Sequence, residues 1–346
     1  MRQVQSPRGR VWSPAKVEGK LSHALLQNLL GSLTPPGREV IIGPKVGEDA
    51  FAARVGETIV VASTDPITFT THEIGYYLVN VNANDVATMG AAPRWLLATA
   101  LFPPGASQTE IAGLFAELDR ACVEVGARLC GGHTEVTSSV TQPVVVGTMI
   151  GFVAKGSLVR PQRVRPGDRV LLTKRLAIEG TAILARERPQ QLKRVVGATG
   201  LAKARKFLHD PGISVVREAL LAVKVASVHA MHDPTEGGLI WGLKELSLAS
   251  GKGIEVDFDD VPIYPETKAI CDYFGINPLG LIASGSLLIV VTARDSIKVR
   301  RSLKRAGIEC SDIGVVKGRG VTLRKGGRRI PLPEIKCDEI ARILGS

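Results

Sequence analysis

The sequence predicts a mixed protein of helices and strands, of the α/β or α+β class, divided into two domains. The chain has 346 residues, which is long for one compact core and sufficient for two. Hydrophobic residues make up 45% of it and charged residues 22%, as in folded globular proteins and unlike disordered chains. Strand-like runs alternate with helical periodicity on both sides of a connector that contains Pro, Gly and Arg, residues 161–168, which is the expected domain boundary.

An N-terminal arm, residues 1–44, is expected to precede the first domain. It holds Pro, Gly and basic residues around one short amphipathic helix, His23–Leu30, and Gly31 follows as a helix stop. A strand is predicted near the end of the arm, at Glu39–Ile42.

The first domain is expected to span residues 45–160. Short apolar runs predict its strands, and longer segments with apolar residues three and four positions apart predict its helices. The strands are Ala50–Ala53, Thr58–Ala62, Trp95–Ala100 and Pro143–Phe152, and the helices are Tyr76–Met89 and Gln108–Val125.

The second domain is expected to span residues 165–346, with the same two kinds of segment. Strands are predicted at Arg169–Lys174, Ile254–Asp257 and Ser286–Val291. Helices are predicted near Gly180 and at Leu192–Leu208, Ile213–Val225, Gly238–Ser250, Pro265–Tyr273 and Pro333–Leu344. The sequence has no repeat period of the solenoid or propeller type.

Five short acidic segments that contain Gly or Asn hold the candidate site residues, and we interpret them as turns at strand ends. They are Gly47–Ala50, Ser63–Pro66, Asn82–Asp85, Gly131–Glu135 and Asp233–Gly238. One such segment alone is typical of an ordinary surface turn. Five of them, most following an apolar run, are expected to gather at one ligand site. Carboxylate oxygens suit Mg²⁺, so the pattern indicates a metal-bridged nucleoside triphosphate.

Three of these segments resemble motifs of the aminoimidazole ribonucleotide synthetase (PurM-like) superfamily, and the resemblance runs from about Lys16 to Leu323. The motifs are Gly47–Ala50, Ser63–Asp65 and Asn84–Ala91. The superfamily also contains thiamine-monophosphate kinase, selenophosphate synthetase and the hydrogenase maturation protein HypE. The segments Asp233–Leu239 and Pro278–Gly285 resemble HypE and its relatives in particular.

The resemblance implies an α+β fold, an α/β sandwich with PurM-like two-domain architecture. The first domain would be ferredoxin-like, would bind ATP and would form a homodimer through its strands, and the second would be α+β. The N-terminal arm either docks on the body of the protein or folds over the nucleotide, as it does in the relatives. Both interpretations stay open.

Asp49, Asp65 and Asp85 are the predicted magnesium ligands, because three carboxylates from three elements can hold ions that bridge phosphates. Glu135 follows the paired glycines where the family has an acidic residue, so we expect it to add a carboxylate to the metal cluster and to take part in catalysis. Glu48 stands at the first acidic place of the family turn. It is expected either to contact the metal or to contact the residues that bind the metal.

Four further residues of the first domain are candidates, each with a structural alternative. Asn84 could contact a phosphate or cap a helix N-terminus. Gly131 and Gly132 allow backbone N–H groups to approach an anion. His133 is either a catalytic base or, more commonly for a lone histidine, a structural turn residue.

In the second domain, Asp233 is a candidate catalytic residue, and the segment after it is a candidate phosphate site. Thr235, Gly237 and Gly238 open a predicted helix, and a helix N-terminus behind glycines binds anions readily. Capping by Asp233 or Thr235 is compatible with that role. Lys174 and Arg175 could add phosphate contacts, but we expect them to be solvated.

The cysteines separate this chain from HypE, which carries its product on a cysteine of a flexible C-terminal Pro-Arg-x-Cys tail. The five cysteines here show no metal or disulfide spacing: Cys122, Cys130, Cys271, Cys310 and Cys337. Cys337 stands in no such tail motif and is expected to be a packing residue in a C-terminal helix. The dehydration of a carbamoyl group to a cyanide is therefore not expected.

The net charge of +11 suits nucleotides or an acidic protein partner, although solvated surface charge explains it equally simply. Aromatic residues are only 4% and do not alternate with basic ones, so nucleic acid binding is not expected. No apolar run has the length of a membrane span, and the first residues lack a secretory core, so a cytoplasmic protein is expected.

The sequence thus predicts an ATP-binding, Mg²⁺-dependent enzyme, a homodimer, that phosphorylates or activates an oxygen-bearing amide, carboxylate or hydroxyl of an unknown small molecule. The alternative is a nucleotide-binding assembly or maturation factor that acts through a protein partner.

Overall fold

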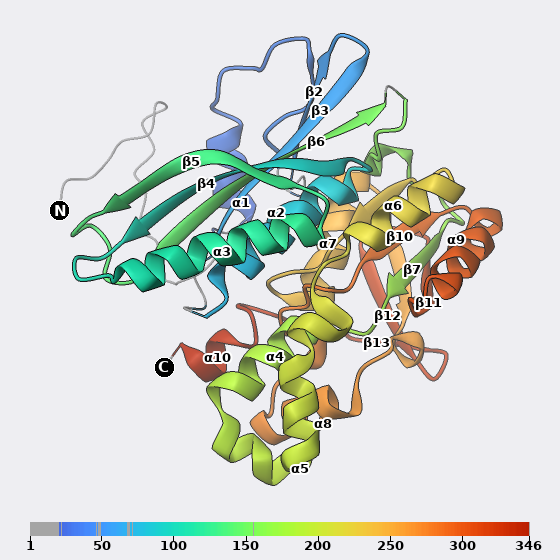
Figure 1. Cartoon of the computed structure of the whole chain (residues 1–346). Helices are drawn as coiled ribbons and strands as arrows, with labels where there is room; N and C mark the ends of the chain where they lie inside the picture. Colours follow the sequence, from blue (N-terminus) through green and yellow to red (C-terminus); the bar gives the residue numbers. More distant parts are fainter. Residues whose placement is uncertain are drawn as a thin grey trace.

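Two β-sheets, each with helices packed on it, lie side by side in the computed structural model (Figure 1). The structure describes residues 21, 23–45, 47, 50–67, 70, 72–154 and 156–345. A short helix, α1 (His23–Leu30), precedes the first sheet. The predicted α+β sandwich class is confirmed by the two mixed layers of helix and sheet.

The first sheet has six strands in the order β1-β2-β3-β6-β4-β5. All neighbours are antiparallel except β4 and β5, which run parallel. The strands are β1 (Val40–Ile42), β2 (Phe51–Val55), β3 (Thr58–Ile67), β4 (Ala92–Phe102), β5 (Arg128–Val136) and β6 (Val144–Ala154). Helices α2 (Ile74–Thr88) and α3 (Gln108–Glu124) cover one face of this sheet (Figure 1).

Helix α2 is the central element of the molecule because it is enclosed on nearly all sides. All but two of its fifteen residues are buried, between β3 and β6 of the first sheet and α6 and β8 beyond it. A helix that is buried all round has little polar-to-apolar asymmetry to show in sequence. Its polar residues therefore face other protein groups rather than water.

The second sheet has seven strands in the order β13-β12-β9-β11-β7-β10-β8. They are β7 (Arg169–Thr173), β8 (Ala230–His232), β9 (Ile254–Asp257), β10 (Leu288–Val291), β11 (Cys310–Val316), β12 (Val321–Lys325) and β13 (Arg328–Ile330). The helices of this part are α4 (Ile178–Glu187), α5 (Pro189–Lys206), α6 (Val216–Val225), α7 (Gly238–Ser250), α8 (Pro265–Phe274), α9 (Ala293–Arg305) and α10 (Ala341–Leu344).

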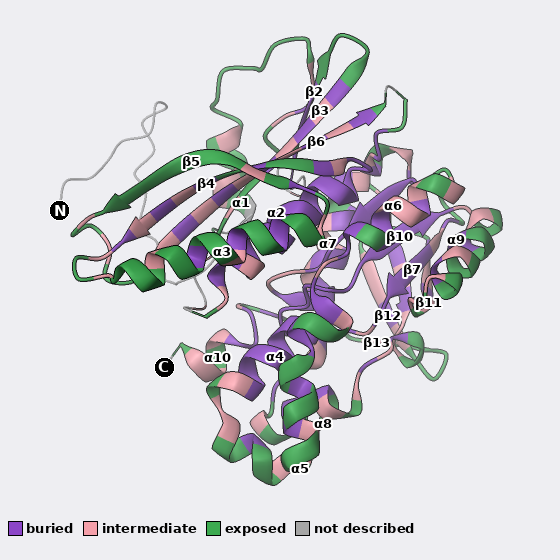
Figure 2. Ribbon diagram, in the orientation of Figure 1, coloured by how far each residue is buried: buried purple, intermediate pink, exposed green. Residues whose placement is uncertain are grey.

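The two parts share their hydrophobic cores. Strand β7 is buried on both faces, with Val170 in the core of the second sheet and Leu171 in a core that continues into the first. Tyr77 of α2 packs in the opposite direction, into the core of the second sheet. Figure 2 shows the resulting band of buried residues through α2, α6 and the strands beside them. Helix α2 therefore lies between the two sheets and contacts elements of both parts.

Several predicted elements are confirmed with little change, among them α1, α3, α7 and β9. Other elements are not predicted by the sequence pattern, namely β5, β8, β11, β12, β13 and α9. The predicted helix at Pro333–Leu344 is wrong, because only the four residues of α10 are helical there. Cys337 consequently lies in a non-helical segment.

Three of the five predicted strand-end turns are also wrong. Residues Ser63–Pro66 lie inside β3, which continues to Ile67. Asn84 and Asp85 lie inside α2, whose N-cap is Glu73, so Asn84 is not a helix cap. Residues Gly131–Glu135 lie inside β5. The predicted domain boundary falls between β6 and β7, next to a short 3₁₀ turn at Pro161–Arg163, and it stays a prediction. No helix in the described ranges has the length and apolar composition of a membrane span.

Candidate functional site

The hydroxyl of Ser63 joins two of the three predicted magnesium ligands. Its Oγ lies 2.6 Å from Asp85 Oδ2 and 3.3 Å from Asp65 Oδ2. Ser63 and Asp65 stand two positions apart on β3 and so share the face that meets α2, which carries Asp85. A hydroxyl has one proton to donate, so it can bridge the carboxylates but cannot neutralise both. Two carboxylates held this close together favour a bound cation between them.

Asn82, which the sequence analysis did not select, locks this arrangement. Its side-chain Oδ1 accepts a 3.0 Å hydrogen bond from the backbone N–H of Asp65, and its Nδ2 donates to Leu78 O at 2.9 Å. The side chain is fully buried. A buried amide that satisfies both a strand and its own helix fixes the distance between them. The Asn-x-Asn-Asp spacing is the sequence signal that could have identified it.

Asn84 fastens the same helix to the second part of the molecule. Its Nδ2 donates to Ile213 O at 2.9 Å, and its Oδ1 accepts from Val215 N at 2.8 Å. These bonds satisfy the backbone just ahead of α6. The structure therefore shows a positioning role for Asn84, and its predicted phosphate contact stays a prediction.

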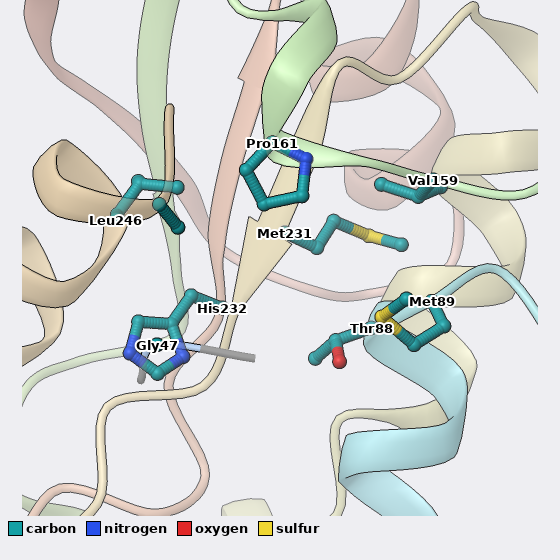
Figure 3. Close-up of a pocket in the computed structure, with 9 residues that line it drawn as sticks. Gly47, Thr88, Met89, Val159, Pro161, Met231, His232 and Leu246 are labelled. Carbon is teal, nitrogen blue, oxygen red and sulfur yellow. The ribbon is translucent and has the colours of Figure 1, made fainter. Parts of the chain in front are cut away.

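Gly47 lies beside the C-terminal end of α2, about one turn beyond Asp85. Asp49 and Glu48 lie outside the described residues. Gly47, which precedes them, lines a small cavity together with Thr88 and Met89 of α2 and with Met231 and His232 of β8 (Figure 3). The cavity has a volume of about 20 Å³, room for about one water molecule. Beside it, His232 Nε2 lies 2.9 Å from Glu245 Oε2 of α7.

The loop between β8 and α7 begins with Asp233, directly after β8, and β8 packs on α2. Asp233 is buried. Gly238 has φ +56°, and an added Cβ would lie 2.6 Å from Leu281 O, so a side chain cannot fit there. Thr235 O accepts from Gly238 N at 3.0 Å, closing the turn that starts α7.

The N-terminus of α7 is already occupied by a carboxylate of the chain itself. Gly237 N donates to Asp338 Oδ2 at 2.7 Å, and Ile340 N donates to Asp338 Oδ1 at 2.8 Å. Burial raises the pKa of Asp338 to about 6. The helix end thus attracts an anion as predicted, but a phosphate would have to compete with Asp338 for the Gly237 N–H. The cofactor-binding roles of Thr235, Gly237 and Gly238 stay predictions.

Glu179, at the start of α4, is a buried acid that the sequence analysis missed. It accepts hydrogen bonds from the hydroxyl and backbone N–H of Ser284, while its Oε2 has no hydrogen-bond partner among the described residues. Burial, with Asp338 and Glu236 nearby, raises the pKa of Glu179 to about 7. A lone acidic residue in the apolar start of a helix was the available signal.

His133 and Glu135 lie apart from the Asp65–Asp85 pair within one chain. Strand register aligns Asp65 with Gly132 across β6 and β4, three strand spacings or about 14 Å away. His133 and Glu135 also point to the opposite face of the sheet, where His133 Nε2 lies 3.3 Å from Glu135 Oε2 in solvent. Glu135 therefore does not join this pair as a metal ligand in the same chain.

Gly131 and Gly132 allow β5 to pair closely with β4. A Cβ on Gly132 would lie 1.8 Å from Ala98 O, and the φ of this residue is +145°. The structural reason for a glycine here is thus backbone approach, and an anion contact stays a prediction.

Lys174 corrects the expectation of a solvated charge. It is buried, pairs with Glu218 at 2.8 Å and donates to Gly212 O and Ser214 O. Burial lowers the pKa of its ammonium group. Arg175, half-exposed, forms two hydrogen bonds with Glu309. Neither side chain is free to hold a phosphate in this arrangement.

The donor set fits a divalent hard cation only in part. Asp65 and Asp85 would supply oxygen ligands, but in the portion of the chain with described placement no group of three or more His, Cys, Asp or Glu residues could hold a metal. Phosphate oxygens commonly complete magnesium coordination. The fold and the site together define a two-domain α+β protein with a pair of carboxylates where β3 meets α2.

Two family models match this chain, one in each of its two parts. The N-terminal domain of AIR synthase related proteins matches residues 47–153, and the C-terminal domain matches residues 165–325. The chain therefore belongs to the AIR synthase related protein family, and the resemblance stated above is confirmed.

Curated relatives and solved structures agree with this assignment. The carbamoyl dehydratase HypE of Cupriavidus necator is 30% identical over 253 residues, 71% of this chain and 69% of the relative. The crystal structure of HypE in complex with ATP has a TM-score of 0.69 at 22% identity, covering 93% of this chain and 97% of that one. AaThiL complexed with AMPPCP and TMP has a TM-score of 0.69 at 19% identity, covering 91% and 94%. These two structures share the fold.

Proposed function

We propose that the protein is a Mg²⁺-dependent, ATP-binding enzyme that phosphorylates an oxygen atom of a small molecule or activates that oxygen through phosphorylation. The observation that carries the proposal is the pair Asp65 and Asp85, held together by Ser63. Relatives of the same fold were solved with ATP and with AMPPCP, which supports a nucleotide as the ligand. One relative is named a dehydratase and another a kinase, so the proposal does not specify which oxygen-bearing group accepts the phosphate.

In this proposal the chain's own residues act mainly by positioning. Ser63 holds the two carboxylates together, and Asn82 keeps β3 at a fixed distance from α2. Bound Mg²⁺ would supply neutralisation of phosphate charge and a template for in-line transfer. Asp49 would add a third carboxylate, and Asp233 a further one from the second domain. Catalysis by position and charge requires this rigidity.

In this proposal the thiol of Cys337 does not carry a reacting group. Trp241 Nε1 donates to Ile335 O at 3.1 Å, two residues before it, and Asp338, next to it, is held by Gly237. A thiol between two anchored residues lacks the freedom to carry a group between sites. The proposed substrate is therefore a diffusible molecule.

The test is ligand-induced stabilisation. Mg²⁺ with ATP should raise the melting temperature, since a ligand at one hundred times its Kd stabilises the folded state by about 2.7 kcal/mol. Asp65→Asn and Asp85→Asn should lose most of this shift, whereas Asp119→Asn, an exposed site on α3, should keep it. Equal shifts in all four proteins would remove the proposed metal site.

ADP release distinguishes the enzyme from the alternative, a nucleotide-binding assembly factor. Turnover of ATP, stimulated by a metabolite in a screen, is expected for the enzyme. Tight binding of ATP with no turnover under any metabolite would favour the assembly factor.

A further inference from the structure

Helix α9 presents the largest concentration of basic side chains without ion pairs among the described elements. Its thirteen residues include six basic ones and one acidic one, Asp295. Lys298 pairs with Asp295 at 2.7 Å. The other five basic side chains form no ion pair with any described residue: Arg294, Arg300, Arg301, Lys304 and Arg305. All five are exposed.

The helix is firmly attached on its other side. Ser296, Val299 and Leu303 are buried at spacings of three and four residues, and α9 packs on α6 and β11. Thr292 caps its N-terminus, with Oγ1 accepting from Asp295 N at 3.1 Å. The basic face is thus held on a rigid element and not on a mobile loop.

A surface hollow runs between this face and the start of β11, and we name it the α9 groove. Its rim is basic and its floor is apolar. It is lined by Ile297, Arg300, Arg301, Lys304, Ile308 and Cys310. Glu309 also lines it, but its charge is paired with Arg175 at 2.8 Å. Burial raises the pKa of the Cys310 thiol to about 12, so this side chain is a neutral part of the floor.

The exposed side chain of Ile297 decides between possible occupants. It is 51% exposed and stands between the basic positions of α9. An apolar centre with a charged rim is the pattern of protein interfaces. A phosphate backbone gains nothing from an apolar floor, and single-stranded nucleic acids use aromatic side chains for stacking, none of which lines the groove.

We propose that the α9 groove docks an acidic amphipathic segment of a partner protein. Carboxylates of the segment would meet Arg300, Arg301 and Lys304, and its apolar side chains would cover Ile297. Such charge complementarity raises the rate of association and selects the partner, while the buried apolar contact slows dissociation. Figure 1 shows α9 on the side of the molecule opposite β5.

The test measures binding to the full chain by fluorescence anisotropy at low and physiological salt. The main probe is a labelled Glu-rich peptide with Leu at helical spacing. Comparison probes are the same peptide with Ser in place of Leu, a single-stranded RNA and a duplex DNA. The Leu peptide is expected to bind about tenfold tighter than the Ser peptide, a difference of about 1.4 kcal/mol.

Two triple charge-reversal variants distinguish binding at the α9 groove from a general effect of the protein's net charge. Arg300→Glu, Arg301→Glu and Lys304→Glu combined should weaken binding of the Leu peptide at least about tenfold. Lys317→Glu, Arg319→Glu and Arg328→Glu combined change the net charge equally at exposed sites elsewhere and should have a much smaller effect. Ile297→Ser should weaken the Leu peptide without changing binding of either nucleic acid.

Three results would overturn the proposal. They are equal loss of binding in both triple variants, tighter binding of RNA or DNA than of the Leu peptide, and absence of peptide binding even at low salt. Melting temperatures and far-UV circular dichroism of all variants establish that the compared proteins are folded.

Discussion

Asn84 combines two roles that sequence reasoning treats separately, since it is part of a family motif and also a structural link. Its amide is fully buried, and it satisfies two backbone groups more than 120 residues away in sequence. Removing such a side chain leaves a buried donor and a buried acceptor without partners, which costs more than the bonds themselves contribute.

Asn84→Ala should therefore lower the free energy of unfolding by about 2–4 kcal/mol, measured by urea denaturation. Asn80→Ala is the matched control on the same helix. Asn80 is also buried, but its Nδ2 only donates to Tyr76 O of its own helix, at 2.8 Å. That carbonyl keeps its helical hydrogen bond, so the control should lose clearly less. Equal losses would show that Asn84 does not link the two parts.

Glu179 predicts a pH dependence of stability with a definite sign. The pKa of its carboxyl is raised from 4.5 to about 7 in the folded protein. The folded state thus binds a proton more tightly than the unfolded state. This contribution to stability is complete below about pH 4.5 and is lost as the pH rises toward 7.

Glu179→Gln should flatten the decline in unfolding free energy between about pH 5 and 7, by up to about 1.4 kcal/mol per pH unit. Asp338, whose pKa is raised to about 6, should leave a smaller slope in the variant. Denaturant titrations at several pH values measure both slopes. Parallel curves for wild type and variant would mean that the Glu179 carboxyl is not the group that titrates.

Strand β5 illustrates how one element depends on its neighbour. The glycines and polar residues of Gly131–Glu135 predict a turn, because these residue types are typical of turns. In the structure the glycines allow an edge strand to pair in parallel with β4, with a register shift between Leu96 and Leu97. The requirement for glycine comes from Ala98 O, an atom on another strand.

Gly132→Ala should consequently disrupt the β4–β5 pairing and destabilise the protein by about 2 kcal/mol or more. Gly113→Ala provides the control, since this glycine lies in α3 and an added Cβ would meet no atom within 4 Å. That change should be neutral or stabilise the protein by up to about 1 kcal/mol. Hydrogen exchange of the β5 amides, together with thermal melts, reports both effects. Unchanged protection of β5 in the Gly132 variant would contradict the interpretation.

At the scale of the whole molecule, the first sheet leaves one face uncovered. Helices α2 and α3 pack on the other face, while Trp95 and Leu97 of β4 are 47% and 41% exposed on this one. His133 and Glu135 of β5 share the same face. An apolar sheet face of this kind is typical of an association surface. The proposed homodimer would use it and would bring His133 and Glu135 to the subunit interface.

Sedimentation velocity should therefore detect a dimer for the wild type and a monomer for Trp95→Glu combined with Leu97→Glu. The control is Phe115→Glu combined with Val123→Glu, two exposed apolar residues on the outer side of α3. This control should remain dimeric, because only the sheet face is expected to be buried between subunits. A monomeric wild type, or loss of the dimer in the control, would contradict the proposed interface.

The sequence by itself determined the local elements and the family. Amphipathic spacing predicted α3, and the glycines of the Asp233–Gly238 segment predicted the start of α7, because these features depend on residues within one or two turns. Short apolar runs predicted β3, β6 and β9 for the same reason. The motifs around Asp65 and Asp85 indicated the family without any knowledge of their contacts.

Only the tertiary structure decided which of these residues meet. The Ser63 hydroxyl joins Asp65 and Asp85 because α2 packs on β3. Glu135, in contrast, lies three strand spacings away on the opposite face of the sheet. Lys174 is buried because Glu218 and two carbonyls surround it, not because of its sequence neighbours. Contacts between distant segments depend on strand register and on packing between layers. Neither can be predicted from the local patterns of a single sequence.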